Sequence, residues 1–274
     1  MLACLELQRR RVPSVVYNAV PEIGGRLQMM GESIKANGNF LRGVLTGLGL
    51  QPLSQQAVKS KAEEWTAERI SDFPFGWVSG MLVQLVSEWS DQGAPERKQR
   101  FKPAVDALRK AIPPPPPGSQ WKHRPRILVP GAGLGRMVWD LGSLGYDVVG
   151  VEVAITMNLV SDYLFRKVLP EHCRRAAALS SSTAARGGEL GIYPGVLEPL
   201  GPNNKRRSSD IFSQVTIPGS DVGTGPTGHV QIIQGDGNIV STMEPGTFDA
   251  VRKILGSNAG STRTPSTLPP YVGP

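Results

Sequence analysis

The stretch RILVPGAGLGRMVWDLGSLGYDVVGVE, from Arg126 to Glu152, constrains the fold of this chain more than any other part of it. A continuous apolar run leads into a glycine turn at 131–135, and a helical pattern then leads to a second apolar run that ends on an acid. Continuous apolar runs are typical of buried parallel strands. A helix between two such strands forms a βαβ unit. The stretch therefore predicts a doubly wound parallel sheet with a nucleotide site at the glycine turn.

The segments that follow continue the alternation of helix and strand. Residues 154–169 predict a second helix, which we expect Pro170 to stop. A loop-rich insertion is expected at about 170–228. Beyond it, HVQIIQGD at 229–236 predicts a third strand, and FDAVRKIL at 248–255 predicts the start of a fourth. This order indicates an α/β fold with parallel crossovers.

The first part of the chain predicts helices. Apolar residues recur at mixed three- and four-residue spacing in 27–50 and in 54–70, and 94–112 is also expected to be helical. Segment 75–90 is apolar on almost all sides, so we expect a buried helix. The prolines at 113–117 predict a stiff polyproline II linker. The expected divisions are a helical extension at 1–112, a proline-rich linker at 113–124, a ligand-binding domain at 125–253 and a disordered tail at 254–274.

Charge and composition argue against several function classes. The net charge is +7, but the positive residues are scattered and only 6% of residues are aromatic, which disfavours nucleic-acid binding. No apolar run approaches the roughly 18 residues of a membrane span, and no secretory signal is visible. Two cysteines, Cys4 and Cys173, fit a reducing compartment, so we expect the cytoplasm, with the nucleus as a second location. His123, His172 and His229 stand far apart, so no metal site is expected.

The spacing of the glycines bears on which nucleotide is bound. A dinucleotide fingerprint would be G-x-G-x-x-G, but Arg136 occupies its third glycine position and the turn reads G-x-G-x-G. S-adenosylmethionine methyltransferases carry such a turn beneath a ligand without pyrophosphate. Glu152 ends the second predicted strand and can accept hydrogen bonds from both ribose hydroxyls. Asp236 ends the third, where an adenine amino group would lie. NAD remains an alternative, since it also requires an acid after the second strand.

An ordered series of motifs resembles the carnosine N-methyltransferase family of S-adenosylmethionine enzymes. The most specific is ILVPGAGLGR at 127–136, in which a proline precedes the glycine turn. EWSDQGAPER at 88–97 resembles the family's helix and linker before the sheet, and LGYDVVGVE at 144–152 follows in order. The segment from Tyr193 to Asp221 resembles a long insertion of the family, and GDGNIV and FDAV resemble the exit of the third strand and the fourth strand.

The resemblance implies a class I methyltransferase fold that binds S-adenosyl-L-methionine. It implies methyl transfer to an imidazole nitrogen of a histidine-containing dipeptide, as in carnosine to anserine, by an enzyme that can form a homodimer. Ser87 departs from a family arginine that reaches toward the cofactor's carboxylate, and Gly237 replaces an aromatic-type residue. The cofactor-binding positions that follow from the turn and the resemblance are Gln84, Gly131, Gly133, Gly135, Glu152, Asp236 and Gly237.

The end of the chain departs most from the family. After Val251 the sequence is polar, rich in proline and serine, and has no strand period. The family's acceptor-binding acid and aromatic residues match nothing here, so we name no catalytic residue. About four of roughly seven expected strands are readable, which predicts an incomplete sheet and a truncated family member. The alternative is an inactive fragment that only binds cofactor.

Overall fold

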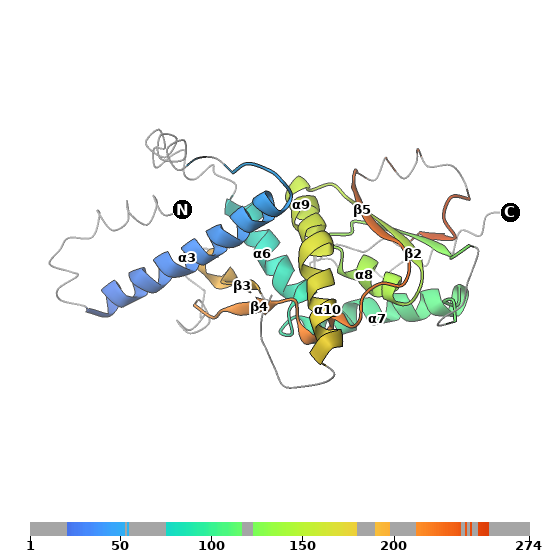
Figure 1. Ribbon diagram of the computed structural model, residues 1–274, viewed down its shortest axis with the longest axis horizontal. Coiled ribbons are helices and arrows are strands. Elements are labelled where there is room, and N and C mark those ends of the chain that lie inside the picture. Colours follow the sequence, from blue (N-terminus) through green and yellow to red (C-terminus); the bar gives the residue numbers. More distant parts are fainter. Residues whose placement is uncertain are drawn as a thin grey trace, which may run out of the picture. The chain divides into compact units, whose positions relative to one another are not determined.

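The computed structural model describes residues 21–52, 54, 75–116, 123–179, 190–197, 212–236, 239, 242 and 246–251 (Figure 1). Within it the chain forms two compact units. The first comprises residues 1–86 and 189–217, and the second comprises residues 87–188 and 218–274. The predicted segment 54–70 and the predicted tail at 254–274 lie outside the described residues, apart from Ser54.

A parallel sheet forms the centre of the second unit (Figure 1). Its four described strands are β1 (Arg126–Pro130), β2 (Asp147–Glu152), β5 (Val230–Gln234) and β6 (Ala250–Val251), in the spatial order β5-β2-β1-β6. Every pairing is parallel: Arg126 lies opposite Asp147, Glu152 lies opposite Gln234, and Ile127 lies opposite Ala250. The predicted α/β class and the parallel pairing of the first strands are confirmed.

The strand order reverses at β1. The chain passes from β1 to β2 and on to β5 on one side, and β6 then pairs with the opposite side of β1. Ligands of open α/β sheets bind at such a reversal, outside the carboxyl ends of the strands. The glycine turn at 131–135 directly follows β1, so the fold places it at this position.

The helices of the second unit pack on this sheet. They include α7 (Ala94–Ala111) and α8 (Arg136–Ser143), which lie where helices were expected. Apolar side chains on both helices, among them Phe101, Val138 and Leu141, join Ile127 and Val148 in one buried cluster. Burying these side chains provides most of the favourable free energy of such a layer. The described prolines 113–116 after α7 form neither helix nor strand.

Pro170 does not stop the helix that precedes it, which corrects the sequence prediction. The helix α9 (Ile155–Tyr163) passes through a π-helical turn (Leu164–Val168) directly into α10 (Leu169–Leu179). In the π-helical turn the Leu169 amide donates to the Leu164 carbonyl, five residues back. Pro170 then falls at the second position of α10, because the wider turn relieves the clash that a proline ring makes inside an α-helix.

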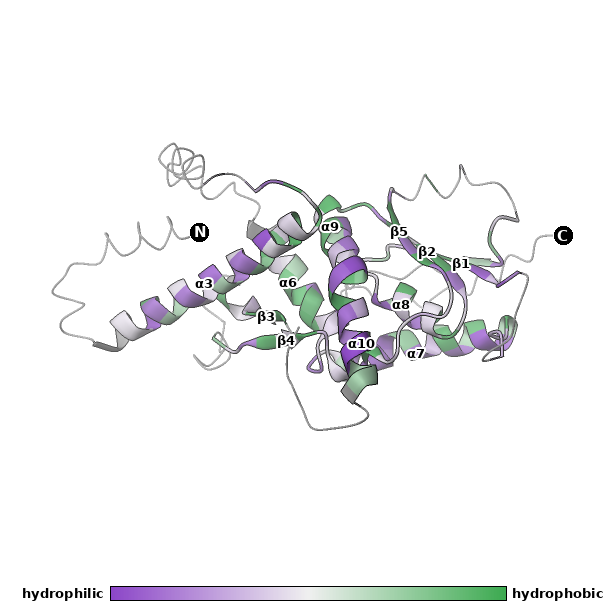
Figure 2. Cartoon of the chain, viewed as in Figure 1, coloured by the Kyte–Doolittle hydropathy of each residue, from purple (hydrophilic) through white to green (hydrophobic). Residues whose placement is uncertain are grey.

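The insertion at 170–228 is more regular than the loop-rich segment predicted from sequence. Its first ten residues are helical as part of α10, on which Figure 2 shows both hydrophilic and hydrophobic residues. In the first unit, β3 (Leu190–Ile192) pairs antiparallel with β4 (Val215–Ile217). Single-turn helices occur at Pro194–Leu197 in the first unit and Ser220–Val222 in the second. The strands are only three residues long, too short for the alternation of apolar and polar residues to reveal them.

The described helices of the first unit are α3 (Pro21–Gly47) and most of α6 (Phe75–Trp89). A buried side chain on α3, Asn37, holds the end of β3: its amide donates to the Tyr193 carbonyl and accepts from the Tyr193 amide, both at 2.8 Å. The prediction that segment 75–90 is buried is wrong in part. Leu82 and Leu85 are buried, but Trp77 is 69% exposed. Apolar composition alone does not show which side of a helix is covered.

The two units divide the chain differently from the expected domains. The break falls near the end of α6, so α7 groups with the sheet and not with a helical extension. The paired strands β3 and β4 group with the helices of the first unit. The reason for the first difference is visible on α7, where Arg97, Phe101 and Ala104 are buried within the second unit.

Candidate functional site

The glycine turn after β1 has a backbone that few other residues can adopt. Gly131, Gly133 and Gly135 have φ angles of 67°, 58° and 85°, in the left-handed region where a Cβ is unfavourable. Two backbone hydrogen bonds hold the turn: the Ala132 amide donates to the Val151 carbonyl and the Gly135 amide donates to the Ala132 carbonyl, both at 2.9 Å. The turn is thereby fixed to the end of β2.

Glu152, the acid predicted to bind ribose, lies directly beside this turn. One carboxylate oxygen accepts the Gly133 amide at 2.8 Å, and the other accepts the Ala154 amide at 2.9 Å. The residue is 9% exposed. Each carboxylate oxygen has a second lone pair. The side chain is therefore fixed in position by the backbone and can still accept hydrogen bonds from a ligand.

The exit of β5 is joined to the same edge. The Glu152 carbonyl accepts the Gly235 amide at 3.0 Å and the Asn158 side-chain amide at 2.9 Å. Asp236 follows Gly235 and is exposed. The structure thus brings the turn, Glu152 and the β5 exit together at the carboxyl edge of the sheet.

Gly135 has a packing reason to be glycine as well as a conformational one. A Cβ built on it would lie 2.4 Å from Cδ1 of Ile232 and 2.8 Å from Cζ of Phe165. Phe165 belongs to the π-helical turn. The absence of a side chain at Gly135 therefore lets α8 start close to both β5 and this turn, and contact of Gly135 with a cofactor stays a prediction.

The structure leaves two other predicted cofactor residues untested. Gln84 is half-buried on α6, within the first unit. Gly237 lies outside the described residues. Both stay predictions from the family resemblance.

Sequence reasoning missed three residues at the strand edge. Val153 and Ile155 follow Glu152 and are 65% and 48% exposed, unusual for large apolar side chains. Asn158 donates to the carbonyls of Glu152 and Ala154, and so fixes the start of α9. Val153, an apolar residue directly after the acid that ends β2, could have been noticed in the sequence. The role of Asn158 could be seen only from its tertiary contacts.

Glu88 joins the segment before α7 to the glycine turn. Its side chain is buried, and its carboxylate accepts the Arg136 amide at 3.1 Å and the Leu134 amide at 3.5 Å. Two further contacts hold the same segments together: the Arg136 guanidinium donates to the Glu88 carbonyl, and the Trp89 indole donates to the Leu134 carbonyl at 3.1 Å. The turn is therefore supported from outside the βαβ unit.

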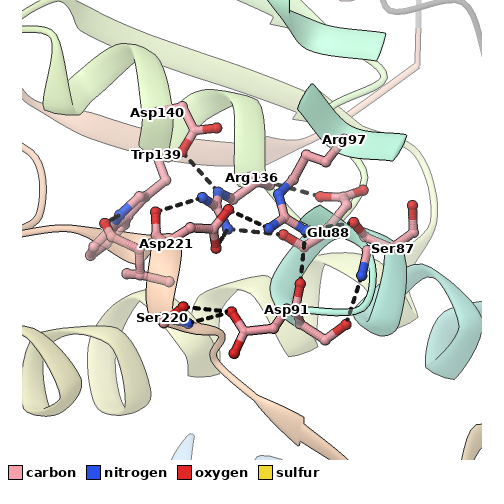
Figure 3. A network of polar contacts seen from close by, with 12 residues as sticks. Ser87, Glu88, Asp91, Arg97, Arg136, Trp139, Asp140, Ser220 and Asp221 are labelled. Atoms are coloured by element: carbon pink, nitrogen blue, oxygen red, sulfur yellow. Dashed lines mark hydrogen bonds and ion pairs between the residues drawn. The ribbon is translucent and has the colours of Figure 1, made fainter. Parts of the chain in front are cut away.

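Two buried arginines share one acid in this network (Figure 3). Arg97 and Arg136 are each 3% exposed and both pair with Asp221, which is 39% exposed. Arg136 also pairs with Asp140 at 2.8 Å. Burial disfavours the charged guanidinium, but Asp140 and Asp221 outweigh this effect and raise the pKa of Arg136. The network is held by charge-assisted hydrogen bonds, which are stronger than neutral ones.

The two acids of the network are shifted in opposite directions. Burial raises the pKa of Asp140, and the neighbouring Arg136 opposes this only in part. Burial would also raise the pKa of Asp221, but the hydrogen bonds and charges of Arg136 and Arg97 outweigh burial and lower it. Asp221 is therefore the acid whose ionised form the fold favours.

The segment 219–222 is held against the same region. Asp91 accepts the amide and the hydroxyl of Ser220 through one carboxylate oxygen, as Figure 3 shows. The Gly219 amide donates to the Trp89 carbonyl at 2.6 Å, and the Trp139 indole donates to the Val222 carbonyl at 3.2 Å. The end of the insertion is thus part of the support of the glycine turn.

Fold and site together define a class of protein. A parallel sheet of order β5-β2-β1-β6, a glycine turn where that order reverses and an acid at the end of β2 belong to the Rossmann-like α/β proteins of the methyltransferase type. Among the described residues, no helix could span a membrane and no group of three or more metal-ligating side chains lies together.

Comparison with known proteins finds similarity to one family. A family model described as carnosine N-methyltransferase matches residues 67–174. Carnosine N-methyltransferase of Dictyostelium discoideum is 24% identical over 242 residues, 85% of this chain and 48% of that protein. The mouse protein of that name is 28% identical over 159 residues, 58% of this chain and 34% of that protein. The chain is similar to the carnosine N-methyltransferase family, and it spans about half or less of the length of these relatives.

Proposed function

We propose that this chain binds S-adenosyl-L-methionine and transfers its methyl group to an imidazole nitrogen of a carnosine-like dipeptide. The observation that carries the proposal is the carboxylate of Glu152, held beside the glycine turn by the Gly133 and Ala154 amides. The relatives' name gives the acceptor class, since each is called a carnosine N-methyltransferase.

The residues at the strand edge fit the parts of this cofactor. Glu152 would accept hydrogen bonds from the two ribose hydroxyls. Val153 and Ile155 offer the exposed apolar surface that an adenine ring needs on one face. Asp236, at the β5 exit, would accept from the adenine amino group. The glycine turn would let the backbone approach the ligand, since it carries no Cβ at three positions.

Ser87 is the position at which this chain departs from the family's arginine. Its hydroxyl is buried and has no hydrogen-bond partner within the described part of the chain. Buried polar groups are seldom left unpaired. We propose that this hydroxyl, in place of a guanidinium, contributes to binding the polar amino-acid end of the cofactor, with a loss of charge attraction.

Methyl transfer requires little acid–base catalysis by the protein. The cofactor, when bound, supplies an electrophilic methyl carbon on a sulfonium. A neutral imidazole already offers a lone pair near neutral pH, so the protein mainly has to align the acceptor and exclude water. The rigid turn and Glu152 would fix the cofactor's end of that alignment. No residue is assigned to the acceptor's end.

Ligand titration tests the cofactor. S-adenosylhomocysteine, the demethylated product, should bind the chain more tightly than NAD in calorimetric titrations. Glu152→Ala should weaken that binding by about 1 to 3 kcal/mol, because it removes the acceptor for buried hydroxyls. Asp162→Ala is the matched control, since that acid is exposed on α9 and pairs only with Arg166 among the described residues. NAD binding without S-adenosylhomocysteine binding would refute the proposal.

Turnover is a separate measurement. Methyl transfer from labelled S-adenosylmethionine to carnosine by the purified 274-residue chain would support the proposed reaction. Binding without turnover would favour the alternative, a chain that holds the cofactor but does not align an acceptor. Lost alignment can cost about 7 to 11 kcal/mol of barrier lowering, enough to hide activity.

A further inference from the structure

The start of α8 is capped by a residue from a distant part of the sequence. Its N-cap residue is Gly135, which has no side chain to cap the helix. The buried carboxylate of Glu88, 48 residues before Arg136, accepts the Arg136 amide at 3.1 Å and lies 3.5 Å from the Leu134 amide. An acid thus occupies the end of the helix where free N–H groups and the helix dipole favour negative charge.

This position has a particular meaning in a doubly wound fold. In dinucleotide-binding proteins, the pyrophosphate lies at the N-terminus of the helix that follows the glycine turn. In this chain the same amides already donate to Glu88. A phosphate placed there would find its donors taken and a negative charge beside it.

The Glu88 carboxylate is also held in place. The backbone of the same residue accepts from the Arg136 guanidinium at 3.2 Å, and the next residue, Trp89, donates to the Leu134 carbonyl. Movement of the side chain away from α8 would leave buried backbone groups unpaired. The acid is therefore a fixed part of the site.

The neighbouring charges do not offer a substitute site for a phosphate. The two arginines nearby, Arg97 and Arg136, are already paired with Asp221, and Arg136 also pairs with Asp140. Both guanidinium groups are therefore already bound to carboxylates, which disfavours recruiting either of them to an anion.

We infer that Glu88 is a specificity-determining residue, whose carboxylate takes the place of a phosphate at the start of α8 and so selects adenosine ligands without phosphates. The inference rests on the proposed function, in which the turn binds an adenosine-containing cofactor. The role of Glu88 differs from the role proposed for Glu152. Glu152 would contact the ribose, which S-adenosylmethionine and NAD have in common, and so would not discriminate between them.

The test compares two ligands that share adenosine, S-adenosylhomocysteine and ADP. The wild-type chain should bind ADP at least about 100-fold more weakly than it binds S-adenosylhomocysteine. Glu88→Gln keeps the shape and a carbonyl acceptor for the Arg136 amide but removes the charge. It should lower the ratio of the ADP Kd to the S-adenosylhomocysteine Kd at least about 10-fold. Asp91→Asn is the matched control, because it removes a charge from the same segment at a site bound to Ser220, and it should leave the ratio unchanged.

A second variant keeps the inference testable where Glu88→Gln folds poorly. Glu88→Ala leaves the amides at the start of α8 without their carboxylate acceptor. Pyrophosphate should therefore raise the melting temperature of this variant by several degrees. The melting temperatures of the wild type and of Asp91→Ala should not change with pyrophosphate. An unchanged ligand ratio in Glu88→Gln, or no pyrophosphate effect on Glu88→Ala, would overturn the inference. Failure of the wild type to bind S-adenosylhomocysteine would instead refute the proposed function. In that case, the difference in ADP Kd between the wild type and Glu88→Gln would still test the role of Glu88.

Discussion

Asp221 shows how much a single side chain can contribute to this site. It accepts from Arg97 on α7 and from Arg136 on α8, and both arginines are buried. Without it, two guanidinium groups would lose a partner in a place that water reaches poorly. Removing one partner of a fully buried pair costs about 3 to 5 kcal/mol.

Asp221→Asn should lower the free energy of unfolding at pH 7 by about 1 to 3 kcal/mol, less than for a fully buried acid because water screens its exposed part. The native pKa of Asp221 lies below its ordinary value of 3.8. Its contribution is therefore complete above pH 3.8 and is lost as the pH falls through the lower native value. Urea unfolding measured at a series of pH values from 7 to below 3.8 tests this. The difference in the free energy of unfolding should shrink as the pH falls below 3.8, and a constant difference would contradict the assignment.

At the scale of elements, the approach of α8 to its neighbours depends on the glycine at its start. Phe165 from the π-helical turn and Ile232 from β5 both reach the position that a Cβ of Gly135 would occupy. The rings of Phe165, Trp89 and Trp139 also pack edge to face, with centroids 5.5 to 6.2 Å apart. The π-helical turn thus sets the position of a ring beneath the glycine turn, in keeping with the frequent occurrence of such turns at functional sites.

Gly135→Ala should destabilise the chain by more than the roughly 1 kcal/mol of an unfavourable backbone conformation, because the added methyl also overlaps two side chains. Gly49→Ala is the matched control, since Gly49 follows the end of α3 with a φ of 76° and has open space around the built Cβ. Thermal unfolding of both variants measures the two costs. Equal losses would mean that Phe165 and Ile232 give way easily.

At the scale of the whole molecule, the predicted contacts of the cofactor belong mainly to the exits of three strands. These exits are the glycine turn after β1, Glu152 at the end of β2 and Asp236 after β5. They are already linked by the Gly133, Ala132 and Gly235 amides. A ligand at this edge would therefore stabilise elements that are far apart in sequence.

Hydrogen exchange with saturating S-adenosylhomocysteine should slow amide exchange at 131–135, 152–155 and 235–236. Helix α3 should be unchanged, because none of its residues is a predicted contact. The protection should be lost in Glu152→Ala and kept in Asp162→Ala. Uniform protection across both units would show a general stabilisation, and protection confined to α3 would place the ligand elsewhere.

The βαβ unit, the glycine turn and the acid at the end of β2 could be predicted from the sequence, because each depends on residues close together in the chain. Strand periodicity and glycine geometry act over a few residues and can be read locally. The folded chain was needed to show that Pro170 lies within a continuing helix, that Trp77 is exposed and that Gly135 faces Phe165. It alone paired Glu88 with α8 and Asp221 with two arginines, 48 to 124 residues apart. Such pairs depend on how layers pack, and no local pattern encodes them.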